Sequence, residues 1–127
     1  MMGTAALTIL PALAPVVARS YGIPPVWIGY QFSTPQTFGA LTFQGGGMFF
    51  DGGWFASIRI QVLQGGAWVT VPGVAFTPAY AGNDGVSFRK YEIAFPAITG
   101  TAIRVDGTPG GRSRFISVGE LRVFRAP

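Results

Sequence analysis

The chain has 127 residues, about the size of one domain, and is long enough to bury a hydrophobic core without disulfides. It contains no cysteine and no histidine, which excludes disulfides, zinc–thiolate sites, thiol nucleophiles and catalytic triads that use histidine. Nine basic and five acidic residues give a net charge of +4, but the basic residues form no stripe or run, so we expect no nucleic-acid partner.

Residues 1–20 are predicted to form an extended N-terminal arm. The arm is apolar, and Pro11 and Pro15 favour an extended path over a helix, with a strand at residues 5–10. No basic residue precedes the apolar run and both prolines interrupt it, which is not typical of a signal peptide. The run is also shorter than the ~18 apolar residues of a transmembrane helix. We expect the arm to pack on its own domain or on a neighbouring chain.

Residues 21–127 are predicted to form one domain of short β-strands. Apolar residues alternate with polar ones over short segments, and clusters of Gly, Pro, Asn and Asp separate these segments. The predicted strands cover residues 27–32, 37–44, 56–64, 67–71, 88–95, 102–106 and 115–125. Gly65-Gly66 predicts a two-residue hairpin turn, and a change of apolar phase at Gly119-Glu120 predicts a β-bulge. The expected fold class is all-β, a single antiparallel β-sandwich of the jelly-roll type.

The glycine-rich segment 45–55 carries most of the candidate contact residues. Its glycines allow sharp turns, and large apolar side chains occupy its tip, unlike in an ordinary polar loop. These side chains are Met48, Phe49, Phe50, Trp54 and Phe55. Three interpretations fit the tip: it closes the end of the hydrophobic core, it packs on a neighbouring subunit, or it stacks on a sugar or a lipid surface.

Two further connections supply other candidate residues. The long connection 72–87 carries Tyr80 and Asn83, and loops of this length in compact domains are often functional or packed on a neighbour. A second glycine-rich loop, before the last strand, carries Arg112 and Arg114. These arginines fit either a solvated surface or a contact with a ligand or a partner.

The acidic residues do not indicate an enzyme. Only Asp51 and Asp84 lie in predicted loops, and each stands beside a glycine, where aspartate is more often a turn residue than a catalytic acid. No phosphate-binding glycine motif is present, and without histidine or cysteine the usual transition-metal ligands are missing. We therefore predict no catalytic residue, no metal site and no cofactor.

Four segments resemble, in order and at similar spacing, those of discoidin domains, also called coagulation factor 5/8 type C domains. Residues 27–35 (WIGYQFSTP) resemble the family's opening W-I-x-V-D-L-G-x-P, and residues 54–68 resemble its Y-x-I-x-Y-S-x-D-G-x-x-W hairpin. Residues 98–105 (ITGTAIRV) are similar to V-x-A-R-Y-I-R-I, and residues 116–124 (ISVGELRVF) to the closing I-S-L-R-E-L-E-V-Y. The resemblance implies an eight-stranded galactose-binding-like jelly roll without catalytic activity. It also implies ligand binding through loops at one end, as in family 32 carbohydrate-binding modules and phospholipid-binding discoidin domains.

The chain departs from this family in two places. The family's acidic D-G-x-x-x-T-x-W loop, which often helps to bind calcium, has no counterpart, because residues 21–26 before Trp27 contain no acid. Many galactose-binding members also use a histidine, which this chain lacks. We therefore expect neither a structural calcium ion nor the histidine-based sugar site.

Two functions fit these observations and are compatible with each other. The first is a structural or attachment subunit of a larger assembly, such as a virus or phage particle, a tail or a surface fibre. It would contact copies of itself or other subunits through the arm and the apolar loops, and its support is a composition with 49% apolar and only 11% charged residues. The second is glycan binding, as a free-standing carbohydrate-binding module; a phospholipid-binding discoidin domain is a further alternative. We favour the assembly subunit, at a particle or surface outside the cell, with glycans as additional partners and no membrane contact.

Overall fold

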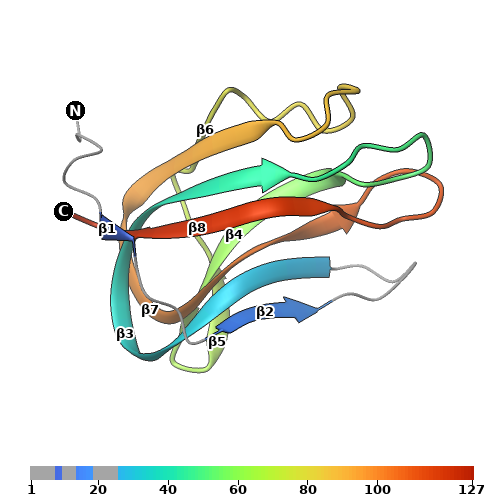
Figure 1. The fold of residues 1–127 in the computed structure, drawn as a ribbon. Helices are drawn as coiled ribbons and strands as arrows, with labels where there is room; N and C mark the ends of the chain where they lie inside the picture. The colour runs from blue at the N-terminus through green and yellow to red at the C-terminus, as the bar shows by residue number, and fades with distance from the viewer. Residues whose placement is uncertain (1–7, 10–13, 19–25) are drawn as a thin grey trace.

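The structure is a computed structural model and describes residues 8–9, 14–18 and 26–127. These residues form an antiparallel all-β fold without a helix, so they contain none that is long and apolar enough to cross a membrane. The strands are β1 (Thr8–Ile9), β2 (Ala14–Ala18), β3 (Val26–Gly45), β4 (Phe55–Gln64), β5 (Ala67–Thr70), β6 (Ala75–Thr77), β7 (Lys90–Pro109) and β8 (Val118–Arg125). All of them belong to one continuous sheet, with β1-β8-β3-β7-β4-β5 as its main order (Figure 1).

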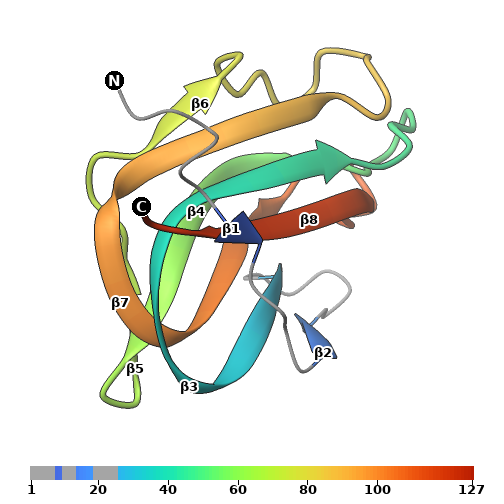
Figure 2. The ribbon, with the colours of Figure 1, turned by 60° about the vertical axis from the view of Figure 1, so that its left-hand side comes forward.

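This sheet folds over on itself, because β3 and β7 bend and pass from one layer to the other (Figure 2). In the first layer, the start of β3 pairs with β2 and with the end of β7, which continues to β4 and β5. In the second layer, the end of β3 pairs with β8 and with the start of β7, which continues to β6. The register shifts between Gln31 and Gln36 and again between Phe38 and Ala40, which is where the strands turn. The predicted all-β, antiparallel fold is therefore confirmed, while the eight-stranded jelly roll stays a prediction.

The division into strands differs from the prediction. The predicted strands 27–32 and 37–44 are one strand, β3, and the predicted strands 88–95 and 102–106 are one strand, β7. Turn residues such as Pro35 produce bulges at which the strand bends, and pairing resumes beyond them. The long connection after β5 also contains a short strand, β6, which the sequence did not predict.

The hydrophobic core lies between the two layers. The first layer contributes inward-facing residues such as Ile60 and Ile103, and the second contributes Leu41 and Ile93, all of them 0–1% exposed. Burial of each such side chain stabilises the fold by about 1.5–3 kcal/mol. Apolar residues alternate along the strands because one face of each layer is buried and successive side chains point to opposite faces.

Two local predictions are confirmed. Gly65 and Gly66 have φ of 56° and 81° and connect β4 to β5, as a two-residue hairpin turn requires. In the pairing of β3 with β8, the partner of Gln44 is Glu120 and the partner of Gly45 is Val118, so Gly119 is the extra residue of a β-bulge.

Parts of the predicted arm add strands to the same sheet. β1 pairs with β8, with Thr8 opposite Arg125, and β2 pairs with the start of β3, with Ala18 opposite Trp27. The other arm residues, including Pro11, lie outside the described residues. The boundary between an arm at 1–20 and a domain at 21–127 stays a prediction.

Candidate functional site

Three loops meet at one end of the sandwich, which we call the loop end. They are the β3–β4 loop (46–54), the β6–β7 loop (78–89) and the β7–β8 loop (110–117), drawn on the right of Figure 1. The Gly46 N–H donates to the Ser117 carbonyl at 2.8 Å, and the Met48 N–H donates to Ser87 Oγ at 2.9 Å. The loops that carry the predicted contact residues are therefore bonded to one another.

Further bonds hold the β3–β4 and β7–β8 loops together. Asp51 accepts from the Ser113 backbone N–H through its carbonyl and from Ser113 Oγ through its carboxylate, both at 2.8 Å. Gly53 donates to the Phe115 carbonyl at 2.9 Å, and its φ of 116° is one that residues with a side chain rarely adopt. Such bonds pre-organise the loop end, which lowers the entropic cost of binding a ligand.

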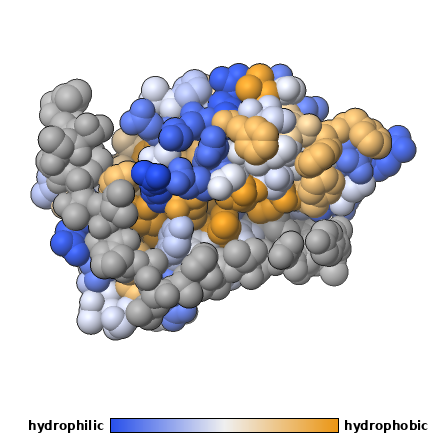
Figure 3. All heavy atoms as spheres, viewed as in Figure 1, coloured by the Kyte–Doolittle hydropathy of each residue, from blue (hydrophilic) through white to orange (hydrophobic). Residues whose placement is uncertain are grey.

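The tip of the β3–β4 loop is apolar and exposed. Phe50 is 97% exposed, and Phe49 is 54% exposed although its ring packs against Phe115 with centroids 5.9 Å apart. The neighbouring β6–β7 loop adds Val86 and Phe88, of which Phe88 is 60% exposed. Figure 3 shows hydrophobic residues gathered at this end of the molecule. Apolar side chains in such a group point to a contact surface rather than to chance exposure.

The inner residues of the predicted set have structural contacts instead. Phe55 is the first residue of β4, is 1% exposed and packs on Phe43. Of the three interpretations, closure of the core therefore holds for Phe55, and its assignment as a ligand or partner contact is wrong. Tyr80 accepts from the Phe55 N–H at 3.1 Å and donates to the Phe55 carbonyl at 2.9 Å. Burial raises the pKa of Tyr80 to about 12.

The space between the loops is too small for a ligand. Met48 and Trp54 are half-buried and line, with Tyr80 and Arg89, a hollow of about 20 Å³. A single water molecule needs a cavity of roughly 10–15 Å³, so this hollow holds about one water molecule. The exposed residues Phe49 and Phe50 lie outside this hollow and do not line it.

The polar candidates lie around this tip. Asn83, Arg112 and Arg114 are exposed, and neither arginine forms an ion pair with the residues that the structure describes. Asp84, in contrast, pairs with Arg89 at 2.7 Å. A hydrogen bond from the Val86 N–H, assisted by Arg89, holds the pKa of Asp84 below its ordinary value. Across the described ranges no three acidic side chains gather as metal ligands.

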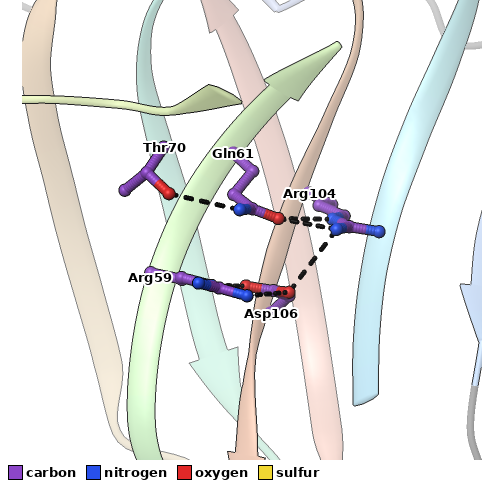
Figure 4. A network of polar contacts seen from close by, with 5 residues as sticks. All are labelled: Arg59, Gln61, Thr70, Arg104 and Asp106. Carbon is purple, nitrogen blue, oxygen red and sulfur yellow. Dashed lines mark hydrogen bonds and ion pairs between the residues drawn. The ribbon is translucent and has the colours of Figure 1, made fainter. Parts of the chain in front are cut away.

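A second surface, absent from the sequence prediction, lies on the outward face of the first layer. Asp106 of β7 is fully buried there and accepts from Arg59 of β4 at 2.6 Å, with Arg104 at 3.6 Å (Figure 4). Gln61 accepts twice from Arg104, at 2.6 and 3.0 Å, and donates to Thr70 of β5 at 3.2 Å. Burial lowers the pKa of Arg104, and the Asp106 carboxylate opposes that shift.

Two tryptophans flank this network, and we call the whole surface the tryptophan face. The Arg104 guanidinium carbon lies 4.0 Å from the ring centroid of Trp68 and 5.2 Å from that of Trp27. Beside the indoles is a hollow of about 90 Å³, lined by Trp27, Tyr30, Gln31, Leu63, Trp68, Ala102 and Ile103. The one signal in the sequence was the polar residues at outward positions of β4 and β7, but their partners depend on strand register.

Two solved structures have a similar fold. A chain of the Streptococcus pneumoniae beta-galactosidase BgaA matches with a TM-score of 0.64 at 16% identity, over 80% of this chain and 69% of that chain. A putative alpha-L-fucosidase from Bacteroides thetaiotaomicron matches with a TM-score of 0.54 at 13% identity, over 85% of this chain and 22% of that chain. No protein-family model and no curated protein matches the chain. At these identities the likeness shows the β-sandwich fold alone.

Proposed function

We propose that this chain is a non-catalytic carbohydrate-binding β-sandwich that holds its glycan on the outside of the loop end. The observation that carries the proposal is the pair of exposed rings, Phe49 and Phe50, beside a loop with two exposed arginines. Ser113, which stands between these arginines, is bonded to Asp51, which follows Phe50. A sugar offers an apolar face to aromatic rings and hydroxyl oxygens to arginine donors, and this surface supplies both.

The fold supports this proposal. The two similar structures belong to proteins named a beta-galactosidase and an alpha-L-fucosidase, so both names refer to carbohydrates. The discoidin-like assignment, with its galactose-binding-like jelly roll, is part of the proposal. Its four resembling segments lie in β3, in β4 with β5, in β7 and in β8, which are the strands that form the two layers.

The acids of the loop end favour binding over hydrolysis. A glycosidase commonly needs two carboxylates that face each other across the scissile bond and are free to act on it. Asp51 is bonded to Ser113, and Asp84 is paired with Arg89. Both loop acids are therefore occupied in holding the loops, which supports a role without catalysis.

The apolar tip also keeps the assembly hypothesis as a second candidate. An apolar residue that is 97% exposed, as Phe50 is, is an anchor that a protein partner would bury. Light scattering after size exclusion tests this candidate. A stable oligomer that Phe50→Ser dissociates would support it, and a monomer at all concentrations would count against self-assembly. Contacts through residues 1–20, other subunits and a phospholipid surface stay predictions.

A glycan array tests the carbohydrate proposal. We expect the wild-type chain to bind a defined subset of glycans and a Phe49→Ser/Phe50→Ser variant to bind that subset more weakly. The matched control is Val69→Ser, which removes an exposed apolar side chain from β5, away from the loop end. Binding that is equal in all three proteins would refute the loop end as the site.

A further inference from the structure

We propose a second ligand site, on the tryptophan face, that binds the ring of a neutral pyranose. The site is the hollow beside the two indoles. In the register of the first layer, Gln31, Ala102, Leu63 and Trp68 form one row across β3, β7, β4 and β5. Ala102 has a short side chain between the longer ones of Gln31 and Leu63, which leaves a hollow of about 90 Å³. At roughly 10–15 Å³ for each water, this hollow has room for several water molecules.

The aromatic walls of the hollow are fixed by their contacts. The indoles of Trp27 and Trp68 have their centroids 6.0 Å apart and their planes inclined by 47°. Arg104 packs on both indoles but does not line the hollow, and it is fixed by two hydrogen bonds to Gln61. The aromatic walls are therefore in place before a ligand arrives, and an indole face suits the apolar face of a pyranose.

The hollow also offers polar groups to a ligand. Gln31 is exposed, and its amide forms none of the side-chain hydrogen bonds among the described residues, so it offers a donor and an acceptor to sugar hydroxyls. Among the described residues no charged side chain lines the hollow, and the nearby Arg59 and Arg104 are bonded to Asp106 and Gln61 instead of facing it. An uncharged lining fits a neutral sugar better than an acidic one. None of the lining residues belongs to the loop end, so this inference does not rest on the proposed function.

Indole NMR separates the two sites. The chain has three tryptophans, and Trp54 lies at the loop end while Trp27 and Trp68 line the second hollow. The three indole N–H signals are assigned with single Trp→Phe variants. The probes are the methyl pyranosides of galactose, fucose, glucose and N-acetylglucosamine. We expect at least one probe to shift the Trp27 and Trp68 signals along one common saturation curve.

Two variants test the hollow itself. Ala102→Leu fills it and should abolish these shifts, while Ala94→Leu adds the same group at an exposed position of the same strand and should leave them unchanged. Gln31→Ala should weaken binding roughly threefold to tenfold without affecting the fold, because it removes hydrogen bonds at an exposed position. Shifts of Trp54 alone, no shift with any probe, or wild-type binding by both the Ala102→Leu and Gln31→Ala variants would each overturn the second site. Trp54 shifts alone would still leave the loop-end proposal standing.

Discussion

Gly29 of β3 lies against the backbone of Arg104 on the neighbouring strand β7, so close that a Cβ at position 29 would stand 2.8 Å from the Arg104 Cβ. Because Gly29 has no side chain, β3 and β7 can approach each other closely at Arg104, whose guanidinium packs on the indoles of Trp27 and Trp68. The geometry of the tryptophan face thus depends on a glycine that has no polar chemistry of its own.

We expect Gly29→Ala to destabilise the fold by about 1–3 kcal/mol, the usual cost of overpacking. The matched control is Gly45→Ala in the same strand, because a Cβ there would meet its nearest atom, the Arg89 carbonyl oxygen, only at 3.9 Å. That control should change stability by less than about 0.5 kcal/mol. Urea denaturation measures both variants, and equal midpoints would contradict the close approach.

Asp106→Asn should be among the most destabilising polar substitutions in this chain. The substitution leaves Arg59 and Arg104 facing a group without charge, and Arg104 is only 12% exposed. We expect a loss of about 2–3 kcal/mol, below the full value for a buried pair because half of Arg59 is solvated. Glu120→Gln, which breaks the exposed pair with Arg122, should cost less than about 1 kcal/mol in the same denaturation experiment. Similar losses of unfolding free energy in the two variants would show that the buried Asp106 pair contributes no more to stability than the exposed pair.

Phe50 and Phe55 lie close in the sequence, but truncation to alanine should affect the stability of the fold very differently at the two positions. Phe55→Ala removes a core side chain and should cost about 3–5 kcal/mol. Phe50→Ala removes a side chain that is almost fully exposed and should change stability by less than about 0.5 kcal/mol. A thermal melt of each variant distinguishes them, and a large loss in Phe50→Ala would mean that the loop tip packs on the domain.

Tyr80 should make stability depend on pH in the alkaline range. Burial raises the pKa of Tyr80 from 10.0 to about 12, so the folded chain keeps a phenol proton that the unfolded chain loses in that interval. The free energy of unfolding should therefore be undiminished below about pH 10 and fall as the pH rises towards 12, by about 1–2 kcal/mol after allowance for solvent screening.

The control for this prediction is Tyr80→Phe, because burial also raises the pKa of Tyr30, which adds its own dependence of stability on alkaline pH. The difference in unfolding free energy between wild type and Tyr80→Phe should shrink from pH 10 to pH 12. A constant difference across that interval would show that Tyr80 ionises normally in the folded chain.

Local patterns were enough to predict much of this fold. Alternating apolar residues marked the strands, Gly65-Gly66 marked a hairpin, and the phase change at Gly119 marked a bulge, since each depends on neighbouring residues alone. The continuity of β3 and β7 could not be predicted, because the same residue types occur in β-bulges and in turns. Only the pairing with a partner strand tells the two apart. Phe55 was assigned to the contact loop because the strand was expected to begin at residue 56. Strand β4 begins at Phe55, which places this side chain in the core.

The two candidate sites differ in how far the sequence reveals them. The loop end was predicted because its exposed aromatic residues follow one another in the chain. Trp27, Trp68 and Arg104 come from three strands, and only the order β3-β7-β4-β5 brings them together. A single sequence carries no record of that order.

Ligand-observed NMR tests directly whether the loop end binds carbohydrate without cleaving it. The probe is fucosyllactose, which contains a galactoside and a fucoside, the two sugars in the names of the similar proteins. We predict saturation transfer from the Ala102→Leu chain, in which the hollow of the tryptophan face is filled, to the sugar. Adding Phe49→Ser/Phe50→Ser to that chain should abolish the transfer, and the anomeric signals should stay unchanged throughout. Carbohydrate binding without cleavage at the loop end would be contradicted by undiminished transfer after Phe49→Ser/Phe50→Ser is added, by the absence of transfer from the Ala102→Leu chain, or by the appearance of free fucose or galactose.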